Sequence, residues 1–157
     1  MKEADGGEVA LLLSLHPVFA KQVFAGTKTV ELRRTRPKVW EGMLVYVYVS
    51  APVKELQGFF EVERVLECSP QQLWDAVGSE SGITKDQFDA YYFGKSVAYG
   101  ICVKNARTLD TPIGLCDLRA SWLGFHPPQC YRYVSHCDLA YVHPDTASRP
   151  RATRCQG

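Results

Sequence analysis

Residues 26–33 read GTKTVELR and lie between an apolar segment that suits a helix and an apolar segment that suits a strand. Gly26 can end the helix by adopting the left-handed conformation. In a strand over the second half of the stretch, alternate side chains share a face, so we predict that Glu31 and Arg33 point away from the core. One interpretation is a solvated strand face with an ion pair between them. The other is a functional site, because a simple turn does not require Lys28, Glu31 and Arg33 together.

Outward from this stretch, the hydrophobic pattern predicts an α+β fold with about six strands and about three short helices. Strands are expected over residues 9–15, about 29–33, 43–50, 55–67, 96–106 and 129–135. Helices are expected over residues 17–25, 70–77 and 84–93, the last two with Ser69 and Thr84 as N-caps. Residues 113–119 fit either a short helix or a turn. Closure of the sheet into a barrel would remove its exposed edges.

Length and composition agree with one compact domain, since 157 residues with 46% hydrophobic content can supply a single core. We expect a disordered N-terminus over residues 1–8, the folded domain over residues 9–135 and a mobile C-terminal tail over residues 136–157. No apolar run approaches the roughly 20 residues of a membrane span, and the acidic N-terminal residues do not suit a signal peptide. This predicts a cytoplasmic protein. The net charge of +1 means that a nucleic-acid site would have to be a local patch.

Six cysteines without a C-x-x-C spacing are expected to be reduced thiols. Cys130, His136, Cys137 and His143 have ligand types that suit zinc, but their spacing is irregular. We therefore expect no metal site and no cofactor, with a structural zinc ion as the less favoured alternative.

The candidate binding residues combine positive charge with aromatic rings. They are Lys28, Glu31, Arg33, Arg34, Arg36, Tyr131, Arg132 and Tyr133. Lysine and arginine can contact phosphates, glutamate can accept a hydrogen bond from a base, and tyrosine can stack on unpaired bases. The alternatives are a solvated loop for the arginines and core packing for the tyrosines. His16 and His126, which both precede a proline, are interpreted as a helix-entry residue and a turn residue.

The spacing G-x-K-x-x-E-x-R within residues 26–33 resembles the signature of the ASCH domain, a member of the PUA-like superfamily. The similarity also includes residues 13–17 (LSLHP) and residues 127–133 (PPQCYRY), and it spans about residues 10–135. The resemblance implies a small mixed β-barrel with a cleft beside the first helix. It also implies a stand-alone prokaryotic protein that binds RNA or regulates transcription.

The resemblance makes binding of RNA or another single-stranded nucleic acid through a basic cleft the leading hypothesis, with a regulatory protein partner as part of it. The alternative is a hydrolase of the ASCH class, either a ribonuclease or an amidohydrolase on a modified nucleoside, with Lys28 and Glu31 as catalytic residues. The amidohydrolase relatives carry a threonine three positions after the lysine, where this chain has Glu31. A nucleoside-like small molecule is a further candidate ligand. Cys130 stands where a small hydroxyl residue is expected, and a thiol is the poorer hydrogen-bond donor.

Overall fold

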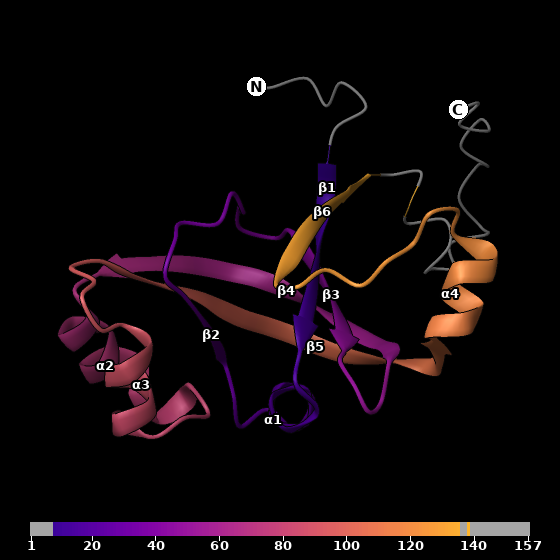
Figure 1. Ribbon diagram of the computed structural model, residues 1–157. Coiled ribbons are helices and arrows are strands. Elements are labelled where there is room, and N and C mark those ends of the chain that lie inside the picture. The colour runs from indigo at the N-terminus through magenta and orange to yellow at the C-terminus, as the bar shows by residue number, and fades with distance from the viewer. Residues whose placement is uncertain (1–7, 136–137, 139–157) are drawn as a thin grey trace.

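The computed structural model describes residues 8–135 and residue 138 (Figure 1). These residues form one six-stranded sheet in the order β2-β5-β4-β3-β1-β6. The strands are β1 (Glu8–Leu15), β2 (Val30–Arg33), β3 (Leu44–Val49), β4 (Glu55–Cys68), β5 (Ala98–Gly114) and β6 (Tyr131–Ser135). β1 and β3 pair in parallel, and the other neighbouring strands are antiparallel. The predicted α+β class and the six strands are confirmed.

Within residues 8–135, four α-helices accompany the sheet, where the sequence predicted about three. They are α1 (Pro17–Ala25), α2 (Pro70–Val77), α3 (Lys85–Tyr91) and α4 (Leu115–Ser121), and the 3-10 helix η1 (Gly78–Glu80) follows α2. The segment of α4 is the one for which the sequence left a helix or a turn open. Figure 1 shows α2 and α3 together at one end of the sheet, α4 at the other end, and α1 between them below the strands.

The boundaries of α1 follow from its sequence. Pro17 occupies the first turn, where a missing N–H costs nothing. Gly26 ends the helix in the left-handed conformation, with φ of 81°, and its N–H bonds back to the last turn. Ser69 and Thr84 cap α2 and α3 through reciprocal hydrogen bonds with the glutamines three residues later. The predicted starts of all three helices are confirmed.

β5 runs to Gly114, eight residues beyond the strand end predicted at residue 106. Most side chains of residues 104–112 are exposed, so this part of β5 lacks the apolar alternation that marks a strand in sequence. It is held by backbone pairing with β4, which extends as far as Glu55 opposite Gly114. Figure 1 shows β4 and β5 as a long ribbon that crosses the whole molecule.

The sheet is open, with β2 and β6 as its edges, so closure into a barrel is not confirmed. The two edges nevertheless approach each other through side chains. The guanidinium of Arg33, at the end of β2, lies 5.0 Å from the ring centre of Tyr131 in β6. The backbone N–H of Lys38 donates to the Tyr133 hydroxyl at 2.9 Å. The sheet is therefore curled, and side chains bridge the space between its edges.

Both faces of the sheet are buried. One hydrophobic cluster, the inner core, lies inside the curl. A second cluster, the outer core, packs the outer face of β1 and β3 against α4 and the segment after it. A third core packs β2 against α2 and α3. Val30 and Leu32 belong to the third core, as predicted. The prediction that Glu31 and Arg33 point away from the core is wrong, because the opposite face of β2 lines the inside of the curl. Glu31 is only 9% exposed.

Gly58 in β4 marks the tightest backbone approach of the sheet. A Cβ atom there would lie 2.2 Å from the Arg107 carbonyl oxygen and 2.7 Å from the Phe24 ring. We expect Gly58→Ala to lower the free energy of unfolding by about 2–3 kcal/mol, because backbone cannot move aside as a flexible side chain can. Urea denaturation measures this. Gly114→Ala is the control, since no atom lies within 4 Å of its added Cβ, and a loss as small as in the control would contradict the prediction.

Several predictions concern residues outside those described. The mobile tail over residues 136–157 falls there except for Asp138, and so do His136, Cys137 and His143 of the zinc alternative. In the predicted disordered N-terminus, Glu8 instead belongs to β1 and pairs with Ser135. Within residues 8–135, no helix is both long and apolar enough to span a membrane.

Candidate functional site

The signature residues form a buried ion-pair cluster, which we call the motif cluster. The Glu31 carboxylate lies between two cations, 3.7 Å from Lys28 Nζ and 3.5 Å from Arg33 Nη2. Lys28 is 4% exposed, and its ammonium also donates to the Ser81 carbonyl oxygen at 2.5 Å. It lies 5.4 Å from the ring centre of Phe19 on α1. The cluster therefore joins β2, α1 and the segment after η1.

Burial sets the protonation of Lys28. Desolvation lowers the pKa of Lys28 below its ordinary value of 10.5, and the neighbouring Glu31 carboxylate opposes this shift. Charged groups in such a position are stable only when each keeps its partners. Lys28 and Arg33 are both paired with Glu31, which leaves Lys28 and Glu31 little freedom to bind a ligand directly, although the buried Arg33 Nε has no hydrogen-bond partner among the described residues.

The lowered pKa of Lys28 predicts a pH dependence of stability. Between that lowered pKa and 10.5 the unfolded Lys28 binds more protons than the folded Lys28, so the contribution of this residue to the free energy of unfolding should rise with pH. Groups whose pKa is raised by burial oppose this rise at alkaline pH, because they ionise first in the unfolded chain: the thiols of Cys68 and Cys102, and at higher pH the phenols of Tyr46 and Tyr92. Urea denaturation from about pH 8 to about pH 9.5 should show a smaller rise for Lys28→Met than for wild type. Lys21→Met, on the exposed face of α1, should keep the full rise, and an unchanged rise in Lys28→Met would refute the assignment.

At the rim of the motif cluster, basic side chains lie over aromatic rings. Arg33 lies over Tyr131 at 5.0 Å, and Arg34 lies over Tyr91 at 5.8 Å. Tyr131 and Tyr133 are half-buried, with ring centres 5.9 Å apart, and both pack against the inner core. Arg34 is exposed. The predicted arginine and tyrosine residues of β2 and β6 are thus brought together.

Two predicted residues lie apart from this rim. Arg36 is exposed and forms a surface ion pair with Glu67. Arg132 is on the opposite face of β6 from Tyr131, with its guanidinium 4.9 Å from the ring centre of Trp122 and 5.6 Å from that of Phe125. Arg132 therefore belongs to the outer core beside α4.

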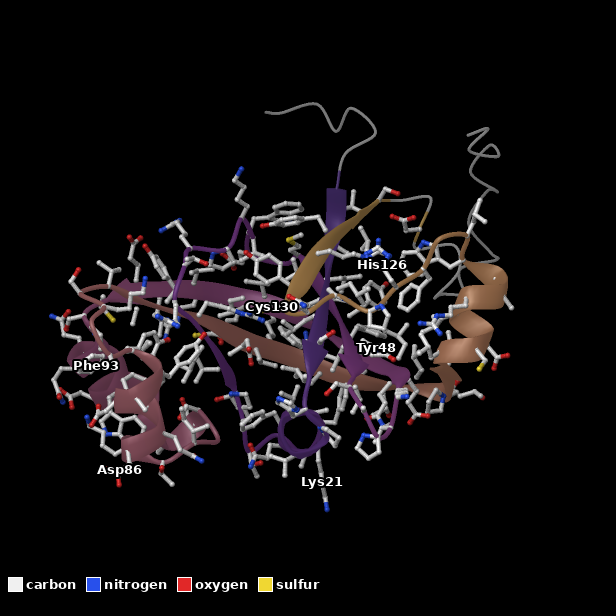
Figure 2. The ribbon with its side chains drawn as sticks, in the orientation of Figure 1. Lys21, Tyr48, Asp86, Phe93, His126 and Cys130 are labelled. Atoms are coloured by element: carbon white, nitrogen blue, oxygen red, sulfur yellow. The ribbon has the colours of Figure 1, made fainter. Side chains whose placement is uncertain are left out.

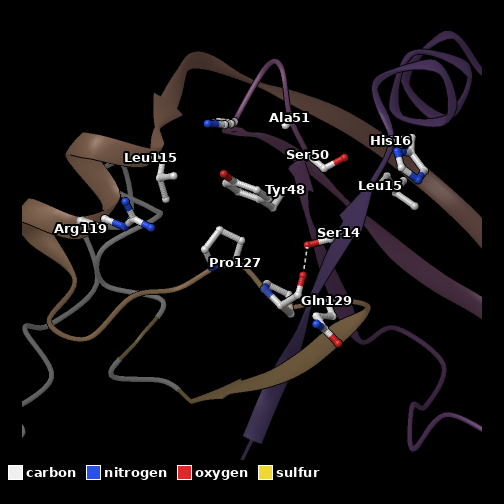
Figure 3. A pocket seen from close by; sticks show the side chains of 12 residues that line it. Ser14, Leu15, His16, Tyr48, Ser50, Ala51, Leu115, Arg119, Pro127 and Gln129 are labelled. Atoms are coloured by element: carbon white, nitrogen blue, oxygen red, sulfur yellow. Dashed lines mark hydrogen bonds between the residues drawn. The ribbon is translucent and has the colours of Figure 1, made fainter.

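A pocket of about 420 Å³ lies at the ends of β1 and β3, beside α4. We call it the β1–β3–α4 pocket. It is lined by Ser14, Leu15, His16, Tyr48, Ser50, Ala51, Lys54, Leu115, Arg119, Pro127, Pro128 and Gln129. Figure 3 shows Tyr48 with Arg119 on the α4 side and with Ser14 and His16 on the β1 side. Among the described residues, the lining has two permanent cations, Lys54 and Arg119, and no acidic side chain.

Parallel pairing brings the pocket residues to one edge of the sheet. β1 and β3 run side by side, with Leu15 opposite Val49, so both strands end at the pocket. α4 is fixed by Leu118 in the outer core, which places Arg119 against the pocket. Lys54 has φ of 54°, a left-handed conformation that is uncommon for a lysine and often found at functional sites. Its carbonyl accepts from the N–H of Leu115 at 3.0 Å.

Tyr48 is 2% exposed, although it lines the pocket. Its ring packs against Phe125, with ring centres 6.1 Å apart. Desolvation raises the pKa of the Tyr48 phenol above its ordinary value, and the positive charge of Arg119 opposes this shift. The phenol is therefore neutral in a pocket that Lys54 and Arg119 also line.

The pocket and the motif cluster are connected by the segment of residues 127–131. Ser14 Oγ donates to the Pro128 carbonyl at 2.7 Å, and the Ser14 N–H donates to the Cys130 carbonyl at 2.9 Å. The next residue, Tyr131, stacks with Arg33. Figure 2 shows Cys130 and Tyr48 over the middle strands, far from Phe93 on the side of α3. The predicted PPQCYRY segment thus borders both sites.

The sequence did not single out Tyr48, Ser50, Lys54 or Arg119 as site residues. Tyr48 lies in a strand whose two faces are both apolar, where a tyrosine suggests core packing. Arg119 is more than sixty positions further along the chain, in the segment without a clear pattern. The available signal was the break at Pro52, followed by a lysine, directly after a buried strand.

Residues 13–109 match the family model of the ASCH domain. A Zymomonas mobilis protein named ASCH domain-containing ribonuclease is 31% identical over 123 residues, which cover 78% of this chain and 82% of that protein. The crystal structure of ASCH from Zymomonas mobilis aligns with a TM-score of 0.81 at 27% identity, covering 87% of this chain and 94% of the other. Structures of a tyrosine-to-phenylalanine variant and a serine-to-alanine variant of that protein align with the same TM-score.

Proposed function

Since this chain belongs to the ASCH domain family, we propose that it acts on RNA, as a ribonuclease that cleaves single strands in the β1–β3–α4 pocket. The observation that supports the proposal is the composition of this pocket, whose lining, within the part of the chain that the structure describes, combines two cations with a buried phenol and contains no acid. RNA cleavage is supported by a relative that is named a ribonuclease and that aligns with this chain over 82% of its own length. The tyrosine removed in a variant of the Zymomonas protein is the residue type found in this pocket.

The pocket suits a phosphodiester. Lys54 and Arg119 can bind the non-bridging oxygens, and an arginine can do so with two hydrogen bonds. The same cations stabilise the negative charge that develops when the phosphorus is attacked. Tyr48 can donate a proton to the leaving oxygen, because a neutral phenol carries a proton, the residue lines the pocket, and the positive charge of Arg119 opposes the rise of its pKa on burial.

A single strand that leaves the pocket can follow residues 127–131 to the rim of the motif cluster. There Tyr131 and Tyr91 offer rings on which bases can stack, and Arg34 is exposed for a phosphate contact. In this proposal the motif cluster has a positioning role. Lys28 and Glu31 hold Arg33 against Tyr131 and do not themselves touch RNA, in place of the catalytic role that the hydrolase alternative gave them.

We expect the wild type to cut fluorescent single-stranded RNA and the Lys54→Ala/Arg119→Ala variant to lose most of this activity. The variant lacks both pocket cations, whereas Lys21→Ala removes an exposed lysine that Figure 2 shows pointing away from the sheet. Denaturing gels report cleavage, and fluorescence anisotropy at several salt concentrations reports binding. Arg34→Ala should reduce the slope of log affinity against log salt by about 0.7.

The same mixtures distinguish the alternatives. Salt-dependent binding without cleavage by wild type would leave RNA binding as the function and refute the ribonuclease. If the wild type neither binds nor cuts RNA, the proposal as a whole is wrong. Equal cleavage by wild type and by the variant without pocket cations would place the reaction outside the β1–β3–α4 pocket.

A further inference from the structure

One corner of the β1–β3–α4 pocket contains two polar groups that the fold itself does not use. Ser50 Oγ is buried and has no hydrogen-bond partner in residues 8–135 or Asp138. His16 is exposed and occupies the N-cap position of α1, but its side chain makes no capping hydrogen bond. Both residues line the pocket. A buried polar group without a partner in a pocket is a place where a ligand can supply the missing hydrogen bond.

The backbone fixes this corner. The Ser50 N–H donates to the Leu15 carbonyl at 2.9 Å, which ties the end of β3 to the residue before His16. The His16 carbonyl accepts from the N–H groups of Phe19 and Ala20, both at 3.0 Å, so the first turn of α1 holds the His16 backbone in place. Figure 3 shows the Ser50 hydroxyl turned toward the side of the pocket on which His16 lies. The imidazole makes an edge contact with Phe19, with ring centres 6.4 Å apart.

The imidazole therefore extends from a fixed backbone and keeps its ring nitrogens free of hydrogen bonds to the described residues. Among the described residues it has no hydrogen-bond partner, since the N-cap role is carried by the backbone alone. Imidazole is the side-chain group that most readily exchanges a proton near neutral pH. A serine hydroxyl can both donate and accept a hydrogen bond. Together they match a substrate hydroxyl that must be oriented and then deprotonated.

We propose that this corner binds the ribose 2′-hydroxyl of RNA, with Ser50 orienting it and His16 accepting its proton. The inference rests on the proposed function and names the reaction as an internal phosphoryl transfer on single-stranded RNA. The 2′-oxygen lies next to its own 3′-phosphate, so a hydroxyl bound at this corner would place that phosphate within the pocket that Lys54 and Arg119 also line. DNA, which lacks the 2′-hydroxyl, cannot react in this way.

The step balances without a further reactant. The 2′-hydroxyl proton moves to His16 as the 2′-oxygen bonds to the adjacent phosphorus. The bond from phosphorus to the 5′-oxygen of the next nucleotide breaks, and Tyr48 donates a proton to that oxygen. The products are a 2′,3′-cyclic phosphate and a 5′-hydroxyl end. Tyr48 then takes a proton from the solvent, and His16 releases the proton that it accepted to the solvent.

The test uses two oligoribonucleotides that differ at the 2′ position of one nucleotide, the one on the 5′ side of the main cleavage bond. With wild type, we expect the all-ribose strand to be cut to a 2′,3′-cyclic phosphate, identified by mass spectrometry, and the strand with 2′-deoxyribose there to stay intact at that bond. His16→Ala should lower kcat by about 100-fold with KM little changed, and added imidazole should restore part of the rate. Ser50→Ala should lower kcat/KM by about tenfold, with partial recovery in Ser50→Thr.

Matched control variants show whether a loss of RNA cleavage comes from misfolding or from an unspecific effect of a substitution. His126→Ala removes an exposed histidine on a turn, and Ser121→Ala removes an exposed serine at the end of α4; neither residue lines the pocket. Both should cut RNA at the wild-type rate. Cleavage at the 2′-deoxy position, a 3′-hydroxyl product, or a His16→Ala variant with the wild-type rate would overturn this inference while leaving a ribonuclease. A wild type that cuts no RNA would overturn the proposed function and the inference with it.

Discussion

Tyr48→Phe is expected to lower the rate of RNA cleavage by about 10²- to 10⁴-fold, the usual effect of removing a proton donor from an enzyme. The substitution removes one oxygen atom and leaves the ring packed against Phe125. Affinity for RNA should change little, because Lys54 and Arg119 remain. The reduction should therefore be found in kcat, and single-turnover assays with excess protein would separate it from substrate binding.

Tyr46→Phe is the matched control for this prediction. Tyr46 lies two residues earlier on the same face of β3, is equally buried, and does not line the pocket. Its substitution should leave cleavage nearly unchanged, whatever it does to stability. A Tyr48→Phe variant that cuts RNA at the wild-type rate would show that another group protonates the leaving oxygen.

Glu31→Gln is expected to lower the free energy of unfolding by about 3–5 kcal/mol, the largest effect on stability that we predict. Glu31 is the carboxylate to which both Lys28 and Arg33 are paired, and all three side chains are at most 12% exposed. The amide is isosteric but neutral. It would leave two buried cations facing each other without an anion.

A double-mutant cycle tests whether the loss of stability in Glu31→Gln comes from its buried cationic neighbours. Removing one buried charge from the Glu31→Gln background, in Lys28→Met/Glu31→Gln, should restore part of the lost stability. Glu67→Gln, which breaks the exposed pair with Arg36, should cost less than about 1 kcal/mol. If Glu31→Gln were no more destabilising than Glu67→Gln in urea denaturation, the motif cluster would have no structural role.

Local chemistry explains which parts of the fold could be predicted from sequence. Pro17, Gly26 and the caps at Ser69 and Thr84 act on their own neighbours in the chain, and the structure has them at the predicted helix ends. The end of β5 could not be predicted, because its polar residues are held by pairing with β4 and not by burial. The prediction that Glu31 points away from the core was wrong for a related reason. Alternation identifies two faces of a strand, but it cannot reveal that a curled sheet buries both.

The candidate site also has one part that the sequence could predict and one part that it could not. Lys28, Glu31 and Arg33 lie within six positions of one another, in β2 and just before it, so a short stretch of chain brings them together. The pocket draws its lining from the ends of two parallel strands, a loop and a helix. None of its polar residues stands out within its own segment. Tyr48 resembles a core residue and Arg119 a surface residue until the fold brings them together.

The lining of the β1–β3–α4 pocket runs from Ser14 to Gln129, with β1 paired to β6 beside it. Contacts between such distant parts of a chain require the closure of a long loop, whose entropic cost is met late on the folding pathway. Interactions within the pocket are then largely absent from the transition state for folding. Substitutions in its lining should alter the unfolding rate more than the folding rate. The chemical centre proposed for this protein is thus among the last parts to be assembled and the first to come apart.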